Sequence, residues 1–382
     1  MGKKKTKEKK TKGKNHFKVA VVDIGSNTVR LVALKVSKKG TKILENNKHI
    51  CELGNLDADG NIPDKNQKLA FRALKDFTKY IKKEKITHII PVATAAARNA
   101  GNGDDFISRA EKKLGHAIRI LSAEEEAKMA AFGVIAARSG KGYEVDVNGI
   151  VADLGGGSLE LARVKNNEVI DGLSTELGTL ILNKQDNPVD YIQDVFDGID
   201  TDFAAAENLF VIGGSWRAVR KTWEETQDGK AHDEGEFDTP AMTCLSAQAA
   251  RDHLDRILML HGRKAETKKD TFPSGLNKDA QAVFEEFDSL SPQRANRIFD
   301  ASLLLQELID KTGAKNVIFV EAGLREGLVY TYVMQSVLTL EASRNFSQMH
   351  TGKGSGPDVE AQSNPSAHIG MVEKPEACTH DA

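Results

Sequence analysis

The sequence contains few cysteines and no long apolar run. Its three cysteines, Cys51, Cys244 and Cys378, are an odd number, lie far apart and form no C-x-x-C pair. A disulfide framework, a structural zinc site and a dithiol redox motif are therefore not expected. No window approaches the roughly 18 consecutive apolar residues of a membrane span, and the start, MGKKKTKEKKTKGKNH, lacks the apolar core of a secretory signal. We expect a cytoplasmic protein without a membrane partner.

The bulk composition is that of a folded globular protein. The 382 residues are 40% hydrophobic and 28% charged, which excludes a fibrous or wholly disordered chain. At roughly 100–200 residues per domain, this length predicts two or three domains with room for a cleft between them.

Both ends of the chain are predicted to be disordered. Residues 1–14 hold eight Lys and one Glu, a charge of +7 that leaves −9 for the rest of the chain. Such a block cannot bury enough surface to offset its ordering entropy. Residues 1–15 are therefore a predicted basic tail, either a solubility segment or an arm that gathers a polyanion. Residues 337–382 lose periodicity and fill with Gly, Ser, Pro and Asn, which predicts a second disordered tail.

Between the tails, apolar periodicity predicts two α/β domains, residues 16–140 and 141–336. The first would contain strands at 17–24, 29–36, 42–51, 88–93 and 117–121, with helices at 65–83, 103–114 and 124–138. The second would contain strands at 148–153, 159–164, 208–212 and 316–320, with helices at 215–225, 246–261, 292–311 and 323–334. The connection at 139–147 is the predicted hinge, and the polar block 226–240 is a predicted loop.

An internal repeat relates the two domains. The segment VVDIGSNTVRLV (21–32) matches VADLGGGSLELA (151–162) at a constant offset of 130, with Asp23 over Asp153 and Gly25 over Gly155. The repeat predicts two similar halves, each presenting one glycine-containing hairpin to a shared cleft.

The two hairpin turns are candidate phosphate-binding loops. Glycines let backbone N–H groups approach a phosphate closely, and the hydroxyls of Ser26, Thr28 and Ser158 add donors. Asp23 and Asp153 end apolar strands, where a carboxylate can hold Mg²⁺. Either turn alone could be a tight turn capped by an Asp, and the second matched copy favours phosphate binding.

The motif LSAEEEAKMAAFG (121–133) offers a candidate general base. Ser122 and Glu125 form a capping box at the start of a helix, which accounts for Glu125 structurally. Because helical residues are about 100° apart, Glu126 shares a face with Met129, Ala130 and Gly133 and must point inward. A carboxylate at a helix start is favoured in its ionised form, as a general base requires. The alternative is three solvated glutamates on a surface helix.

Three further positions have both a functional and a structural interpretation. Arg98 follows a strand and suits a guanidinium that reaches a phosphate, or it is a surface arginine. Gly213, Gly214 and Ser215 form a helix N-terminus that suits an anion, or they serve tight packing alone. Glu160 is a second metal ligand or a solvated side chain.

Taken together, the motifs VVDIGSNTVRLV, VATAAAR, EEEAKMAAFGV, VADLGGGSLEL, VIGGSWRA and AGLREGLVY resemble the exopolyphosphatase and guanosine pentaphosphate phosphatase (Ppx/GppA) family, in its order, from about residue 17 to 332. The resemblance implies two ribonuclease H-like domains of the actin-like ATPase superfamily, with mixed sheets around a central cleft. It places the general base on Glu126, a phosphate-contacting arginine on Arg98, and acidic metal or phosphate positions on Asp153 and Glu160. The chain is similar to the short form without a C-terminal HD-like domain. At Gly213–Arg217 it departs from the family's small turn, and we expect Trp216 to narrow the substrate entrance and Arg217 to add a charge.

The predicted function is that of an exopolyphosphatase that hydrolyses the terminal phosphate of inorganic polyphosphate with Mg²⁺. The alternatives are a guanosine pentaphosphate or nucleoside triphosphate phosphohydrolase, a catalytically weak polyphosphate- or alarmone-binding regulator, and a sugar-kinase-like enzyme of the same superfamily. K⁺ is a candidate stimulating cation, and we expect a homodimer without a specific nucleic acid partner. The predicted catalytic residues are Glu126 and Arg98, and the predicted metal ligands are Asp153, Glu160 and Asp23. The predicted substrate-binding residues are Ser26, Asn27, Thr28, Arg98, Gly155, Gly156, Gly157, Ser158, Gly214, Ser215 and Arg217.

Overall fold

The computed structural model describes residues 16–37, 40–139, 146–199, 203, 206–227, 242–262 and 275–334. Both predicted tails, most of the predicted hinge and most of the predicted loop at 226–240 lie outside the described residues. In the part of the chain that is described, no helix combines the length and the apolar character needed to cross a membrane.

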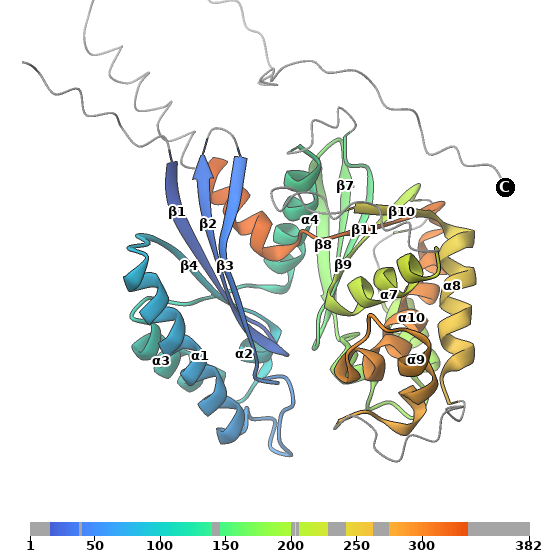
Figure 1. Cartoon of the computed structure of the whole chain (residues 1–382), viewed down its shortest axis with the longest axis horizontal. Helices are drawn as coiled ribbons and strands as arrows, with labels where there is room; N and C mark the ends of the chain where they lie inside the picture. The colour runs from blue at the N-terminus through green and yellow to red at the C-terminus, as the bar shows by residue number, and fades with distance from the viewer. Residues whose placement is uncertain are drawn as a thin grey trace, which may run out of the picture.

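The first half forms a five-stranded mixed sheet with two long helices on one face (Figure 1). Its elements are β1 (His16–Ile24), β2 (Thr28–Ser37), β3 (Gly40–Ile50), α1 (Asp64–Lys83), β4 (His88–Ala93), α2 (Ala95–Asn99), α3 (Gly103–Leu114) and β5 (Arg119–Ile120). The strand order is β3-β2-β1-β4-β5, with an antiparallel β1-β2-β3 meander and with β4 and β5 parallel to β1. Alternate residues of β1 and β2 pack against α1 and α3, because side chains of a strand alternate between its faces.

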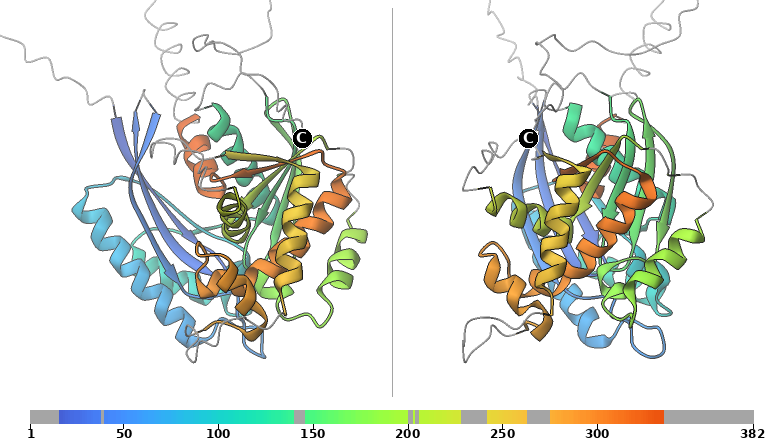
Figure 2. Two further views of the ribbon diagram at one scale, coloured as in Figure 1. Left: turned by 45° about the vertical axis from the view of Figure 1, so that its right-hand side comes forward. Right: turned by 90° about the vertical axis from the view of Figure 1, so that its right-hand side faces the viewer.

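The second half forms a six-stranded mixed sheet covered on one face by helices. Its elements are β6 (Gly149–Leu154), β7 (Leu159–Lys165), β8 (Glu168–Thr175), α5 (Thr179–Leu182), α6 (Pro188–Asp197), β9 (Asn208–Gly213), α7 (Gly214–Glu225), β10 (Met242–Ser246), α8 (Ala247–Leu260), the 3₁₀ turn η1 (Lys278–Ala280), α9 (Gln281–Glu286), α10 (Pro292–Thr312) and β11 (Asn316–Val320). The strand order is β10-β11-β9-β6-β7-β8. Figure 2 shows the yellow helix α8 on the outside of this half.

The two sheets repeat one topology. The antiparallel meander β1-β2-β3 with β4 parallel to β1 corresponds to the meander β6-β7-β8 with β9 parallel to β6. The hairpins of the sequence repeat thus occupy equivalent places in the two sheets. The expected fold class, two mixed-sheet α/β domains, is confirmed.

The helices that connect the halves exchange sheets. Helix α4 (Ala123–Ser139) follows the first sheet in sequence but packs on β6, β7 and β8 of the second. Residues 324–334 form a helix that follows the second sheet but packs on β1 and β2 of the first. Figure 1 shows both helices between the two sheets. A division of the chain at residue 140 therefore separates each helix from the sheet that it covers.

Glycines permit the crossing of these two helices. A Cβ on Gly327 would lie 1.8 Å from the carbonyl oxygen of Met129, and one on Gly133 would lie 2.1 Å from the carbonyl oxygen of Gly323. A side chain at either position would force the helices apart. The two halves are thus joined by backbone contact at the crossing.

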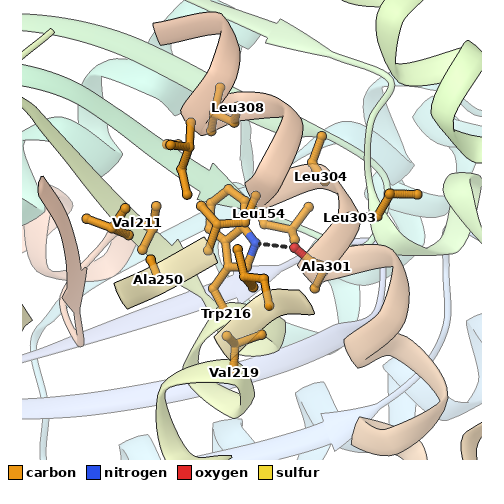
Figure 3. Packing of buried hydrophobic residues seen from close by; sticks show 14 of the residues in the cluster. Leu154, Val211, Trp216, Val219, Ala250, Ala301, Leu303, Leu304 and Leu308 are labelled. Atoms are coloured by element: carbon orange, nitrogen blue, oxygen red, sulfur yellow. Dashed lines mark hydrogen bonds between the residues drawn. The ribbon is translucent and has the colours of Figure 1, made fainter. Parts of the chain in front are cut away.

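Trp216 belongs to the core of the second half. Its side chain is fully buried among residues of β9, α8 and α10, and its indole Nε1–H donates a hydrogen bond of 2.8 Å to the carbonyl oxygen of Ala301 (Figure 3). The expectation that Trp216 narrows the substrate entrance is wrong. The side chain lies on the apolar face of α7. Full burial of a large aromatic ring is most favourable when its N–H has a hydrogen-bond partner, and Ala301 is that partner here.

Candidate functional site

The two glycine turns share one backbone geometry. The N–H of Gly25 donates to the carbonyl oxygen of Thr28 at 3.0 Å, and the N–H of Gly155 donates to that of Ser158 at 2.9 Å. Each turn closes its hairpin in this way at the end of an apolar strand. The sequence repeat is therefore a repeat of local structure.

The turns also approach each other between the halves. A Cβ on Gly156 would lie 3.2 Å from the Cβ of Asn27, and one on Gly157 would lie 2.7 Å from the Oγ of Ser26. A larger residue at either glycine would crowd the facing side chain of the other turn. The glycines thus bring the backbone amides of one turn beside the polar side chains of the other.

A second backbone segment supports each turn from below. In the first half, the N–H of Gly54 donates to the carbonyl oxygen of Ser26 at 2.8 Å. In the second half, the N–H of Leu180 donates to the carbonyl oxygen of Gly156 at 2.7 Å. In both cases the neighbouring segment binds a carbonyl group of the turn. These two contacts therefore do not occupy N–H groups of the turns.

A cavity of about 260 Å³ lies where the two turns meet. The predicted site residues that line it come from both halves: Asp23, Ser26, Asn27, Thr28, Glu126, Asp153, Gly155, Gly156, Gly157, Ser158, Glu160, Gly214, Ser215 and Arg217. Among the described residues that border the cavity, Arg98 is absent, and its side chain instead contacts Glu126.

Glu126 begins helix α4 at the cavity wall. The predicted capping box is present: the N–H of Glu125 donates to the Oγ of Ser122 at 3.1 Å, and the N–H of Ser122 donates to the carboxylate of Glu125 at 3.0 Å. This fixes the first turn of α4 and leaves Glu126 on the inward face, 8% exposed. The interpretation as three solvated glutamates is excluded for Glu126, whereas Glu124 is exposed and pairs with Lys128.

Arg98 holds the carboxylate of Glu126. Its Nη1 lies 3.0 Å from Oε2 of Glu126 and donates a second hydrogen bond of 2.7 Å to the carbonyl oxygen of Leu121. Burial nevertheless raises the pKa of Glu126 to about 7, with Arg98 opposing the shift and the nearby carboxylates adding to it. A carboxyl group whose pKa lies near neutrality can accept a proton from water and later release it.

An acidic cluster faces the same cavity. Asp153 and Glu160 are direct cross-strand neighbours on β6 and β7, so their side chains lie on one face of the sheet. Removal from water raises the pKa of Asp153 to about 6 and raises that of Glu160 further above its usual range, with Glu126 adding to the shift of Glu160. Glu160 is 3% exposed, which excludes the solvated alternative.

The donor set suits a hard cation such as Mg²⁺. Burial is the main cause of these raised pKa values, and a divalent cation beside the two carboxylates would favour their ionised forms. In the described part of the chain, no three or more Asp, Glu, His or Cys side chains converge as a metal cage. Mg²⁺ commonly uses one or two carboxylates together with substrate phosphates, so Asp153 and Glu160 fit that mode. Asp23 is instead engaged by Arg325, whose Nη1 lies 2.8 Å from its Oδ2.

A set of cationic side chains, here called the cationic wall, lines the same cavity as the acidic cluster. Of its members, Arg217 was predicted from the sequence. The wall consists of Arg30, Lys48, Arg217, Arg294 and Arg297, which all line the cavity. Burial and the neighbouring Arg294 and Arg30 lower the pKa of Lys48 to about 8. Burial, Arg325 and Arg217 lower that of Arg30 to about 10. These cations repel one another, and a bound polyanion would relieve that repulsion.

One signal in the sequence pointed to this wall. The repeat places Arg30 over Glu160, and the structure pairs Arg30 with Asp23 across the first hairpin as it pairs Glu160 with Asp153 across the second. The two turns are thus similar in backbone but opposite in the charge beside them. By contrast, Lys48 and Arg294 stand in no motif that could have marked them.

The N-terminus of α7 completes the wall. Gly214 and Ser215 form its first turn, and a Cβ on Gly214 would lie 2.6 Å from Nη1 of Arg294. The glycine therefore lets a guanidinium approach the end of a helix, where free N–H groups and the helix dipole favour an anion. Tight packing alone does not account for this position, because it opens to the cavity.

Solved structures of similar fold include the *Aquifex aeolicus* member of the Ppx/GppA protein family, with a TM-score of 0.64, 20% identity and coverage of 84% of this chain and 99% of that one. An exopolyphosphatase from *Cytophaga hutchinsonii* gives a TM-score of 0.67, 18% identity and coverage of 83% and 98%. These likenesses confirm the fold that the resemblance implied, two mixed-sheet α/β domains.

Two curated proteins carry different names at equal similarity. The chain is 24% identical over 318 residues to a guanosine-5'-triphosphate,3'-diphosphate pyrophosphatase of *Aeromonas hydrophila*, covering 81% of this chain and 58% of that protein. It is 24% identical over 323 residues to exopolyphosphatase 1 of *Mycobacterium leprae*, covering 82% of this chain and 88% of that protein. A family model described as the Ppx/GppA phosphatase family matches residues 31–336. The chain therefore belongs to the Ppx/GppA phosphatase family.

Proposed function

We propose that this protein hydrolyses the terminal phosphoanhydride bond of inorganic polyphosphate. The observation that carries the proposal is the place of Glu126, a buried carboxylate that lines a cavity bordered by two glycine turns and by six cationic side chains, the five of the cationic wall and Arg325. Such a cavity suits a substrate made of closely spaced phosphates, and the carboxylate suits activation of water beside the last of them.

In the proposed mechanism, the protein positions the phosphates and removes one proton. The turn amides, Ser26, Asn27 and Ser215 bind the terminal phosphates, while the cationic wall offsets the charge of the preceding ones. Glu126 accepts the proton of the attacking water. Arg98 keeps the carboxylate of Glu126 directed at that water through its hydrogen bond and through its anchor on Leu121.

Mg²⁺ is the proposed cofactor, held by Asp153 and Glu160. When bound, it would neutralise charge on the phosphate oxygens. Stimulation by K⁺ and a homodimer are part of the proposal, as is a cytoplasmic location, which was expected from the absence of a long apolar run and of a secretory signal in the sequence.

Hydrolysis of guanosine pentaphosphate is the second candidate, favoured by the name of the *Aeromonas* relative. Among the described residues that line the cavity, none is aromatic. Nucleobases are commonly bound by stacking on aromatic rings. The lining thus offers charge for a phosphate chain and no ring for a base, which ranks polyphosphate first.

The deciding experiment compares phosphate release from long polyphosphate, tripolyphosphate, guanosine pentaphosphate and ATP under identical conditions with Mg²⁺. We expect the largest kcat/KM with a polyphosphate. If phosphate is released only from guanosine pentaphosphate or only from ATP, that compound is the substrate and the proposal of polyphosphate is wrong. Tight binding of polyphosphate without release would indicate a regulator, and phosphate transfer to an acceptor would indicate a kinase.

The rate of hydrolysis should rise with pH through about 7. A general base works in its ionised form, and burial raises the pKa of Glu126 to about 7, so the base is lost as the pH falls below that value. A bound divalent cation favours the ionised form and would move the midpoint to lower pH. The measurement is kcat/KM for tripolyphosphate from about pH 5 to about pH 9, at fixed free Mg²⁺. In Glu126→Gln, the residual kcat/KM should no longer fall as the pH is lowered below about 7. If the fall persists in this variant, it arises from protonation of the substrate and not of Glu126.

Substitution of Gly178 by Ala should damage the second glycine turn. A Cβ there would lie 2.3 Å from the carbonyl carbon of Gly157 and 2.3 Å from the nitrogen of Ser158, so the turn must move. Because misplacement by about 1 Å can cost roughly 10²-fold, we expect kcat/KM to fall by about that factor. Gly198→Ala is the matched control, since its Cβ would meet no atom closer than 3.5 Å. Equal activity of the two variants would show that the turn does not hold substrate.

A further inference from the structure

An acidic side chain, that of Glu321, lies beside the cationic wall and has no place in the proposed mechanism. Glu321 follows β11 directly and lines the cavity together with Arg217. Its Oε1 lies 3.6 Å from Nε of Arg217. That Nε–H is buried and has no hydrogen-bond partner among the described residues. The carboxylate of Glu321 therefore lies close enough to Arg217 to attract its positive charge. It is too far away to accept a hydrogen bond from the Nε–H of Arg217.

Glu321 is held in this position from behind. Nη2 of Arg220, a residue that is 7% exposed, lies 2.6 Å from Oε1 of Glu321. Nη1 of Arg220 lies 3.2 Å from Oε1 of Glu224, which also accepts a hydrogen bond of 3.1 Å from Thr243. This chain of contacts runs from the cavity to β10. Because Arg220 is anchored at both ends, the carboxylate of Glu321 is a fixed negative charge.

A fixed carboxylate beside Arg217 opposes phosphate at that place. Phosphate and carboxylate are both anions, and both use a guanidinium as their partner. A phosphate that binds Arg217 must share it with Glu321 and lie near a like charge. The strength of that repulsion depends on distance and is greatest in a cavity shielded from water.

We propose that Glu321 is a built-in competitor of phosphate that acts through Arg217 and weakens the retention of phosphate anions in the cavity. It is a positioning and affinity-setting residue, because it acts on Arg217 and takes no part in bond breaking. The inference rests on the proposed function in one respect, that the cavity receives phosphates. Its consequence is that orthophosphate, the product of each cycle, leaves a strongly cationic wall more readily than the wall alone would allow.

The test measures binding rather than turnover. Dissociation constants of orthophosphate and tripolyphosphate are measured by calorimetry for the full chain and for Glu321→Gln, with orthophosphate inhibition as a second readout. We expect the variant to bind both anions roughly 3- to 30-fold more tightly, the range of coupling between charges in contact. Glu321→Asp retains the charge and should stay close to the wild-type affinity. A gain of affinity is a result that simple structural damage would not produce.

Glu224→Gln is the matched control. It removes the other carboxylate that holds Arg220, in the same network, and Glu224 is not among the described residues that line the cavity. It should lower thermal stability as Glu321→Gln does, yet change the affinity for phosphate by less than about twofold. Equal tightening in both variants would show a general charge effect and overturn the inference.

A double variant tests the route through Arg217. In a protein with Arg217→Gln, the further change Glu321→Gln should no longer tighten phosphate binding. Persistent tightening would overturn the role of Arg217. Unchanged affinity in Glu321→Gln, with normal binding by the wild type, would overturn the inference and leave the proposed function intact. A wild-type chain that neither binds tripolyphosphate nor hydrolyses it would overturn both.

Discussion

Replacement of Glu126 by Gln is expected to lower the turnover of tripolyphosphate by roughly 10²–10⁴-fold, the usual contribution of general acid–base catalysis. The amide keeps the size of the side chain, and its oxygen can still accept the hydrogen bond from Arg98. It cannot accept a proton from water, so chemistry is lost while the fold and the cavity remain. The measurement is kcat together with the dissociation constant of tripolyphosphate, which should change little.

Glu124→Gln is the control for this prediction. Glu124 lies two residues earlier in the same helix, is exposed and pairs with Lys128 on the helix surface. Its replacement should leave turnover within about twofold of the wild type, because surface ion pairs of this kind contribute little. Wild-type turnover in a correctly folded Glu126→Gln protein would remove Glu126 from the mechanism.

Replacement of Asp153 by Asn is expected to lower hydrolysis at moderate Mg²⁺ by at least roughly 10²-fold, or to raise the concentration of Mg²⁺ that hydrolysis requires. Asp153 carries one of two adjacent carboxylates whose pKa values are raised chiefly by burial, so a bound cation would favour their ionised forms. The amide keeps one oxygen ligand but removes the charge that attracts the cation.

Two readouts separate metal binding from catalysis. Hydrolysis by the wild type should stop in excess chelator and return with Mg²⁺. In addition, Mg²⁺ should raise the melting temperature of the wild type and not that of Asp153→Asn. The control is Glu168→Gln, which replaces an exposed carboxylate on β8 of the same sheet. This variant should behave as the wild type in both assays. Full hydrolysis in chelator would rule out the metal.

Local patterns in the sequence predicted the parts of the fold that depend on neighbours in the chain. The two hairpins follow from apolar strands ending in Asp and Gly, and the capping box at Ser122 and Glu125 follows from a spacing of three residues. The inward face of Glu126 follows from helix geometry alone. By contrast, the edge strands β8 and β10 were not predicted, because their short, mixed polar sequences carry no clear alternation.

The direction of single side chains was less predictable. Trp216 was expected at the substrate entrance and lies in the core, because its position on α7 relative to α8 and α10 decides which side is apolar. Arg98 was expected to contact phosphate, and in the structure its side chain contacts Glu126, because α2 and α4 bring the two residues together from different parts of the chain. In both cases the residue was identified by its motif, and its partner was not.

By itself, the sequence determined the two hairpins, their repeat, the buried carboxylate at the start of α4 and the resemblance to a family. These features arise from contacts within a few residues, whose geometry the backbone fixes locally. Only the tertiary structure decided that α4 and the helix at 324–334 exchange sheets, and that Arg325 pairs with Asp23 across 302 residues of sequence. It also brought Arg30 and Lys48 of one half beside Arg217, Arg294 and Arg297 of the other. Long-range charge gathers where two packed halves meet, and that place is set by the burial of both apolar cores and not by any local pattern.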